Sequence, residues 1–210
     1  MSIARVQSKL HQYSGNSSSL TISLDSAPTE GNLLIAAIGT YGSYAPFVDH
    51  IDQGDYVDWT RQIESHRDSL YGRRVEIWAG VVSANASSNL TIYLGDSGSG
   101  SNADPVIADV CEYQGLQTVN FKDQTATYPY AGVNTRTLET GYTSTTTRAN
   151  ELWVGGIFNV CNQGGYDDDT QSTNNFYLLD GEGIPIGGQT KSLAYLEKIV
   201  STTGIAWSGC

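Results

Sequence analysis

A proline-containing turn that leads directly into an apolar segment is the feature that most constrains the fold of this chain. The turn spans residues 26–32 and includes Pro28, and every residue from 33 to 38 is apolar, up to Gly39. This segment is too short to cross a membrane, and it lacks the polar stripe of a surface helix. We therefore expect residues 33–38 to form a strand that is buried on both faces.

Short apolar or alternating segments recur along the rest of the chain, separated by turns rich in Gly, Asn, Ser and Thr. Nowhere do apolar residues recur with helical spacing over a helix-length window. The predicted strands cover residues 3–7, 20–24, 33–38, 59–64, 73–82, 89–94, 106–113, 119–121, 151–158, 176–179 and 192–200. This pattern predicts a single all-β domain over residues 1–210, built as an antiparallel two-sheet sandwich of the jelly-roll type.

Long polar stretches interrupt the predicted strands. Residues 40–56 and 162–175 are expected to be irregular loops, residues 125–150 are rich in threonine and turns, and residues 181–188 are expected to form a glycine-containing turn. Loops of this length in a compact domain usually carry function. We therefore look for binding residues in these stretches.

The charge balance restricts the partners. The chain has 22 acidic and 11 basic residues, which gives a formal net charge of −11. Nucleic acids and anionic membrane surfaces are bound through clustered Lys and Arg, so we expect neither as a partner. The acidic balance favours neutral ligands such as glycans, or divalent cations.

Three cysteines cannot all pair within one chain. Cys111 and Cys161 lie in or beside predicted strands, so we expect buried thiols there, whereas Cys210 is placed to reach another chain and its state stays open. The first residues show no apolar signal core. We therefore expect either a chain that is made and assembled in a cytoplasm or a leader that lies outside the given sequence. The location that we expect is a virion or the surface of an extracellular assembly, without a visible signal peptide.

Four sequence landmarks resemble those of β-sandwich modules from bacterial surface proteins and phage particles. They are Val-Gln-Ser at residues 6–8, Ser-Ala-Pro-Thr-x-Gly-Asn-Leu-Leu-Ile at 26–35, Asn-Glu-Leu-Trp-Val-Gly at 150–155 and Glu-Lys-Ile-Val-Ser-x-Thr-Gly at 197–204. The resemblance implies a β-sandwich and carries no common activity or catalytic residues. Those modules continue with a further strand after the Thr-Gly, so the resemblance also implies an open edge here that a neighbouring chain covers.

Acidic residues offer candidate metal sites. Asp49, Asp52, Asp55 and Asp58 recur every third residue, and we expect solvated loop charges there, with a Ca²⁺ site or a glycosidase acid/base pair as alternatives. In the run 167–169, Asp167 and Asp169 are the candidates to hold Ca²⁺. We expect no cofactor other than this optional calcium ion.

Several tyrosines fall in predicted loops, where a core role is least expected. Tyrosine offers a large rigid surface with one polar tip, which suits contacts with proteins and stacking on sugars. The candidates for partner or glycan binding are Tyr41, Tyr44, Tyr128, Tyr130 and Tyr166.

The sequence contains no complete catalytic set that we recognise, so we expect a non-enzymatic role. Our hypothesis is a structural subunit of a surface assembly, specifically a phage virion protein such as a capsid decoration or tail appendage, with copies of itself or other subunits as partners. A carbohydrate-binding or adhesin module is the alternative, and a glycoside hydrolase is a more distant one. The identity and symmetry of the assembly and the identity of any ligand stay open.

Overall fold

Twelve β-strands make up most of the computed structural model, which describes residues 2–15, 17–42, 46–67, 72–95, 106–128, 138–161, 173–180, 183–186 and 189–209. The strands are β1 (Ala4–Ser14), β2 (Ser19–Ser23), β3 (Leu33–Gly42), β4 (Phe47–Asp52), β5 (Val57–Arg67), β6 (Gly72–Val82), β7 (Asn89–Gly95), β8 (Val106–Gln114), β9 (Glu151–Cys161), β10 (Tyr177–Asp180), β11 (Gly183–Ile186) and β12 (Gln189–Val200).

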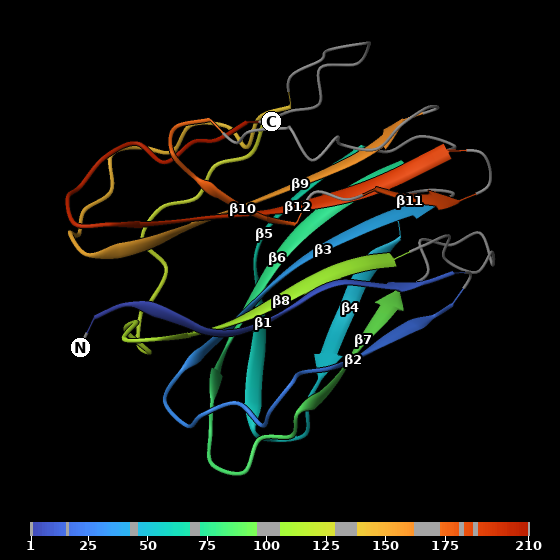
Figure 1. Ribbon diagram of the computed structural model, residues 1–210, viewed down its shortest axis with the longest axis horizontal. Coiled ribbons are helices and arrows are strands. Elements are labelled where there is room, and N and C mark those ends of the chain that lie inside the picture. The colour runs from blue at the N-terminus through green and yellow to red at the C-terminus, as the bar shows by residue number, and fades with distance from the viewer. Residues whose placement is uncertain are drawn as a thin grey trace.

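These strands form three antiparallel sheets. The central sheet has the order β1-β8-β3-β6-β5, a second sheet contains β9, β12, β10 and β11, and a third has the order β2-β7-β4. The second and third sheets lie on opposite sides of the central sheet (Figure 1). The predicted all-β antiparallel sandwich is confirmed, with three sheets where two were expected.

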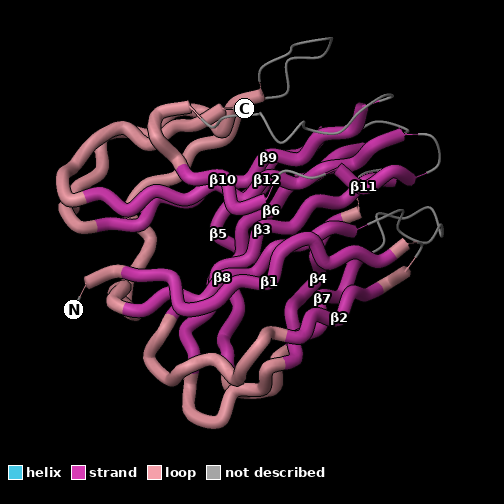
Figure 2. Tube along the Cα trace, in the orientation of Figure 1, coloured by secondary structure: helices cyan, strands magenta, loops and turns pink. Residues whose placement is uncertain are grey.

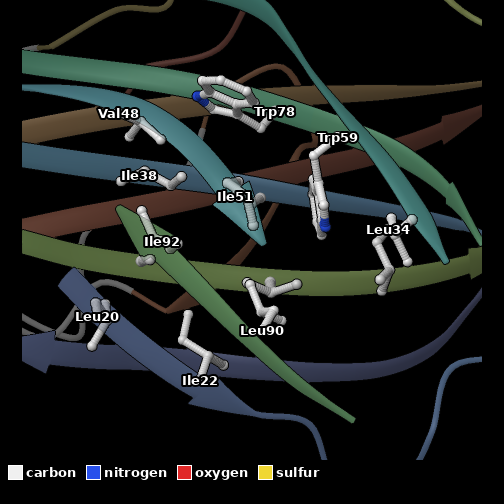
Figure 3. Close-up of a cluster of buried hydrophobic side chains, with 14 of the residues drawn as sticks. Leu20, Ile22, Leu34, Ile38, Val48, Ile51, Trp59, Trp78, Leu90 and Ile92 are labelled. Atoms are coloured by element: carbon white, nitrogen blue, oxygen red, sulfur yellow. The ribbon is translucent and has the colours of Figure 1, made fainter. Parts of the chain in front are cut away.

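Strand β3 lies in the middle of the central sheet and is buried along its whole length. Leu34, Ala36 and Ile38 pack toward the β2-β7-β4 sheet, whereas Ile35 and Ala37 pack toward β9 and β12. Figure 3 shows the first of these two clusters, with side chains from both sheets pointing toward one another. The prediction of a strand buried on both faces is confirmed.

The second cluster joins the central sheet to the β9–β12 pair. Ile107 and Cys111 of β8 face Leu193 and Tyr195 of β12, and all four side chains are buried. Phe158 of β9 packs directly on Gly39, where a Cβ atom would overlap the Phe158 ring. Glycine at position 39 therefore allows the two sheets to approach each other here.

The turn before β3 is fixed by one buried carboxylate. Glu112 of β8 is fully buried, and its Oε1 accepts hydrogen bonds from the Thr29 N–H at 2.8 Å and from Asn32 Nδ2 at 2.6 Å. Its Oε2 accepts one from Gln7 Nε2 at 2.6 Å. Gln7 also bonds to both backbone groups of Ser26. The sequence landmarks at residues 6–8 and 26–35 therefore meet at Glu112. Their role here is structural.

A second polar network lies between β8, β12 and β1. Tyr113 donates to Glu197 Oε2 at 2.6 Å, its hydroxyl oxygen lies 3.1 Å from that of Tyr195, and Arg5 pairs with Glu197 Oε1 at 2.7 Å. Burial raises the pKa of the Cys111 thiol from its ordinary 9.0 to about 12, and it raises the pKa of Tyr113 and Tyr195 far above their ordinary 10.0. The predicted buried thiol at Cys111 is confirmed. The side chain of Cys161, and Cys210 as a whole, lie outside the described residues.

Three sequence predictions about local structure are wrong. The expected loop 40–56 contains the end of β3 and all of β4, and the expected turn 181–188 contains β11. The expected strand at 119–121 has no regular structure. The other predicted strands are found, with ends shifted by up to four residues, except that β1 extends seven residues beyond the predicted end.

Candidate functional site

Non-strand segments gather over one end of the sandwich, at the upper left of Figure 2. We call residues 116–128, 138–150 and 201–209 the covering layer. Within it, Asp123 accepts hydrogen bonds from the Thr147 hydroxyl at 2.7 Å and the Thr147 N–H at 2.6 Å, and Arg148 donates to the Asn120 carbonyl at 2.8 Å. The bonds from Thr147 also hold the pKa of Asp123 below its ordinary 3.8. The first two segments are thus fastened to each other.

Three threonines, spaced three residues apart, hold the third segment in place. The N–H of each threonine donates to the carbonyl of one residue in 204–208, and its Oγ1 accepts the N–H of that same residue. The pairs are Thr140 with Ser208, Thr143 with Ala206 and Thr146 with Gly204, at nitrogen–oxygen distances of 2.8–3.1 Å. We call this arrangement the threonine clasp. It satisfies backbone groups that would otherwise need a sheet partner.

Replacing Thr143 with valine is expected to loosen the threonine clasp, because the Ala206 N–H then loses its acceptor. We expect a loss of about 1 kcal/mol in stability and faster amide hydrogen exchange across residues 204–208. The matched control is Thr145→Val, because Thr145 is exposed and meets Ile205 through the backbone alone. Unchanged exchange in Thr143→Val, measured by mass spectrometry, would contradict the clasp.

The covering layer and the sandwich together border a half-open pocket of about 290 Å³, which we call the cavity. Ile63, Ile77 and Ala79 of the central sheet form its floor, and Leu152 and Val154 of β9 form one wall. Aromatic side chains complete the lining: Phe121, Trp153, Phe176 and Trp207. The result is a mainly apolar cavity with polar groups from the covering layer at its rim.

The charged groups at the rim are bonded within the chain. Besides Asp123 and Arg148, Lys122 Nζ donates to the Gln62 carbonyl at 3.4 Å, and Trp153 Nε1 donates to Glu151 Oε2 at 3.3 Å. Opposite charges are also balanced across the rim, with two cations and two carboxylates. Neither positive nor negative side chains predominate among the described residues that line the cavity.

The structure gives mixed results for the tyrosines predicted to bind partners. Tyr128 is 43 % exposed in the covering layer, as expected for a contact residue. Tyr41 lies in β3 instead of a loop and is only 8 % exposed, with Lys191 Nζ 4.9 Å from its ring centroid. The predicted loop position of Tyr41 is therefore wrong, and burial removes this side chain from any contact surface. Tyr44, Tyr130 and Tyr166 lie outside the described residues.

The aspartate candidates do not form a metal site in the part of the chain that the structure describes. Asp49 bonds to His50 Nδ1 at 2.8 Å, and Asp52 accepts the Gly54 N–H at 2.8 Å. Asp55 and Asp58 are exposed like the other two. Among the described residues no three His, Cys, Asp or Glu side chains are grouped so as to hold a metal ion. The calcium candidates Asp167 and Asp169 lie outside these residues.

The cavity and the covering layer were not predicted from the sequence. The threonine spacing of 140, 143 and 146 was a visible signal, since period three fits neither a sheet (period two) nor a helix. Asn120 and Asn150, with φ of +51° and +58°, mark the turns that shape the rim. Asparagine tolerates this left-handed conformation better than most residues.

The fold and the site define an antiparallel β-sandwich with an apolar cavity beneath a non-strand covering layer. No protein-family model, no curated protein and no solved structure matches the chain. Within the described residues, no helix has the length and apolar character required to cross a membrane.

Proposed function

We propose that this protein is a non-enzymatic structural subunit of a surface assembly, of the kind found on phage particles, and that it binds copies of itself or neighbouring subunits. The observation that carries the proposal is that, among the described residues, no strand pairs with the second edge of β9. The resemblance of the sequence landmarks to phage and bacterial surface modules supports the location on a particle. The net charge of −11 is in keeping with protein neighbours rather than nucleic acid.

Strand β9 is long, regular and weakly charged. It pairs with β12 over all eleven residues without a bulge, and in the described part of the chain no strand pairs with its second edge. Its one charged residue is Glu151, and it contains neither lysine nor proline. Near its end Asn159 Oδ1 accepts the Val160 N–H at 2.8 Å. An edge of this kind is a template for pairing with another chain.

The other long edge strands are protected. The register of β1 shifts at two places, between Arg5 and Gln7 and between Lys9 and Gln12. Strand β5 has a bulge between Arg61 and Ile63 and carries four further charged or histidine residues along its length. Bulges and charges prevent pairing between edges. The contrast makes β9 the edge best suited to a subunit contact.

Exposed apolar side chains on the covering layer offer a further contact surface. Val119 is 68 % exposed, and Tyr128, Tyr142 and Ile205 are also exposed. Side chains of this kind are enriched in protein interfaces. Because the threonine clasp and the Asp123–Thr147 bonds fix the covering layer, a partner meets a preorganised surface.

Placing a lysine beside the β9 edge is expected to weaken self-association. Asn159 is half-buried on β9, and Asn159→Lys adds a charge that must be desolvated when another strand pairs there. We expect the wild-type chain to associate in a concentration-dependent manner in sedimentation, and Asn159→Lys to weaken this about tenfold, equal to roughly 1.4 kcal/mol.

The matched control is Ser23→Lys, which adds the same charge to an exposed position on β2, an edge strand of another sheet. This variant should associate like the wild type. A wild-type chain that stays monomeric at millimolar concentration contradicts the proposal, as does equal weakening by both lysines.

One observation favours the alternative of a carbohydrate-binding or adhesin module. The rings of Tyr142 and Trp207 stack with centroids 5.0 Å apart, and Tyr142 is 56 % exposed. Exposed aromatic rings provide flat faces on which sugars stack. Glycan-array binding by the monomer that is lost in Tyr142→Ala would favour this alternative.

A further inference from the structure

We propose that the cavity beneath the covering layer is a binding site for an uncharged, mainly apolar compound of about two aromatic rings. Residues 151–155 of β9 line part of the cavity, but the inference does not require the assembly role.

The size and lining of the cavity set the class of ligand. Its volume of about 290 Å³ is near the lower end of pockets that hold small molecules, roughly 300–1,000 Å³. A dry cavity of about 150 Å³ already accommodates benzene. The floor side chains Ile63 and Ile77 are only partly buried, so a ligand placed on them removes further apolar surface from water.

The walls favour a ring over a flexible chain. Phe121 packs in the same cluster as Ile77, Ala79, Leu152 and Val154. Trp153 and Phe176, with ring centroids 6.3 Å apart, belong to the cluster on the other face of β9, and together with Trp207 they line the cavity where it passes the edge of that strand. Aromatic side chains gain from stacked or edge-to-face contacts with another ring, beyond the burial of area.

The rim argues for a ligand without charge. The carboxylate of Asp123 is bonded by Thr147, the guanidinium of Arg148 by the Asn120 carbonyl, and Lys122 by the Gln62 carbonyl. A charged ligand entering this mainly apolar space would lose much of its hydration, and a rim with two cations and two carboxylates provides no net opposite charge to offset that cost. A neutral ligand leaves all of them in place.

The roof of the cavity is held open by bonds of the covering layer itself. Residues 120–123 are fastened to 147–148, and Ala206 and Trp207 are fixed by the threonine clasp. Asn120 and Asn150 adopt left-handed backbone conformations at the rim. Because these contacts already order the roof, a ligand needs little further ordering of the chain on binding.

The test uses the full chain and the neutral fluorescent probe N-phenyl-1-naphthylamine. We expect a saturable one-to-one rise in fluorescence, with a Kd of about 1–100 μM for a ligand of this size. The anionic probe 1-anilinonaphthalene-8-sulfonate, which has a similar ring system, should bind at least about tenfold more weakly.

Two variants fill the cavity from opposite sides. Ala79→Leu adds bulk to the floor and Ala126→Trp adds it to the roof, and each should weaken binding of the neutral probe at least about tenfold. The matched control is Ala27→Leu, which adds the same side chain at an exposed turn residue and should leave the Kd within about twofold of wild type. Near-ultraviolet circular dichroism identifies which variants are folded.

Failure of the wild-type chain to bind the neutral probe saturably would overturn the proposal. Unchanged binding in a folded cavity-filling variant would overturn it as well, because the probe would then lie elsewhere. Equal affinity for the two probes would overturn the assignment to an uncharged ligand. The measurements are repeated in Asn159→Lys, the variant that is expected to weaken self-association through β9. Each outcome above can therefore be judged whether or not the chain self-associates.

Discussion

Replacing Glu112 with alanine is expected to lower the free energy of unfolding by at least about 3 kcal/mol. The fully buried carboxylate accepts hydrogen bonds from the Thr29 N–H, the Asn32 amide and the Gln7 amide. The bond from the Asn32 amide is buried and the other two are partly buried, and a donor left without an acceptor away from water costs about 1–3 kcal/mol. A loss of this size is a large part of the total stability of a typical domain, about 5–15 kcal/mol.

Urea unfolding followed by tryptophan fluorescence measures this effect. The matched control is Glu30→Ala, which removes the same side chain from an exposed position in the turn that Glu112 holds. We expect that change to stay within about 0.5 kcal/mol of wild type. A loss below about 1 kcal/mol in Glu112→Ala would mean that the turn is fixed by other contacts.

Stability is also expected to fall steeply above about pH 10. Burial raises the pKa of Cys111 to about 12 and the pKa of Tyr113 and Tyr195 well above 10.0, so the folded chain keeps these three protons after the unfolded chain has lost them. Their stabilising effect is complete below the unfolded pKa values of 9.0 and 10.0, and it is lost as the pH rises toward the folded values. Three groups together contribute a slope of about 4 kcal/mol per pH unit.

Unfolding measured between pH 8 and pH 11 tests this slope. In Tyr195→Phe one of the three protons is absent, so the slope should fall by about a third. Phenylalanine fits the same apolar surroundings, and the Tyr113 hydroxyl retains Glu197 as its acceptor. A slope that is the same in wild type and in Tyr195→Phe would show that the alkaline transition has another origin.

The predicted strands that the structure confirms are those whose pattern is uninterrupted. Strands β3 and β8 have nearly continuous apolar sequences because both faces of the central sheet are covered. Strand β7 alternates because only one of its faces is buried. In both cases the burial pattern repeats along the strand, so it is visible in the sequence.

Strand β4 was missed because a bulge breaks its alternation. The register shifts between Val48 and His50, so the buried residues Val48 and Ile51 are three positions apart instead of two. The strand is anchored by a contact the sequence does not reveal, from the Val48 N–H to Glu76 Oε1 at 2.9 Å. Apart from the half-buried Phe47, its remaining residues are exposed aspartates and a histidine, which are typical of a loop.

The position of Tyr41 was missed for a different reason. The apolar run before it stops at Gly39, which resembles a strand end. Glycine is present there because the Phe158 ring occupies the space of a side chain, and β3 continues past it. A contact with a residue 119 positions later in the sequence cannot be inferred from local pattern.

The covering layer depends on contacts of the same long range. Thr143 and Ala206 are 63 residues apart, and Asp123 and Thr147 are 24 apart. These hydrogen bonds involve polar side chains and backbone groups, so no periodic pattern of apolar residues marks them in the sequence. The threonine content of the region was visible, but which backbone each hydroxyl would meet was not.

The order of strands in the central sheet has a consequence for how the protein is made. Strand β1 pairs with β8, about a hundred residues later, and Arg5 meets Glu197 across a separation of 192 residues. On the ribosome, the N-terminal strand must therefore wait, with its polar groups solvated, until most of the chain has emerged. Topologies dominated by such distant pairings fold slowly, and a waiting strand is vulnerable to association with the wrong neighbour.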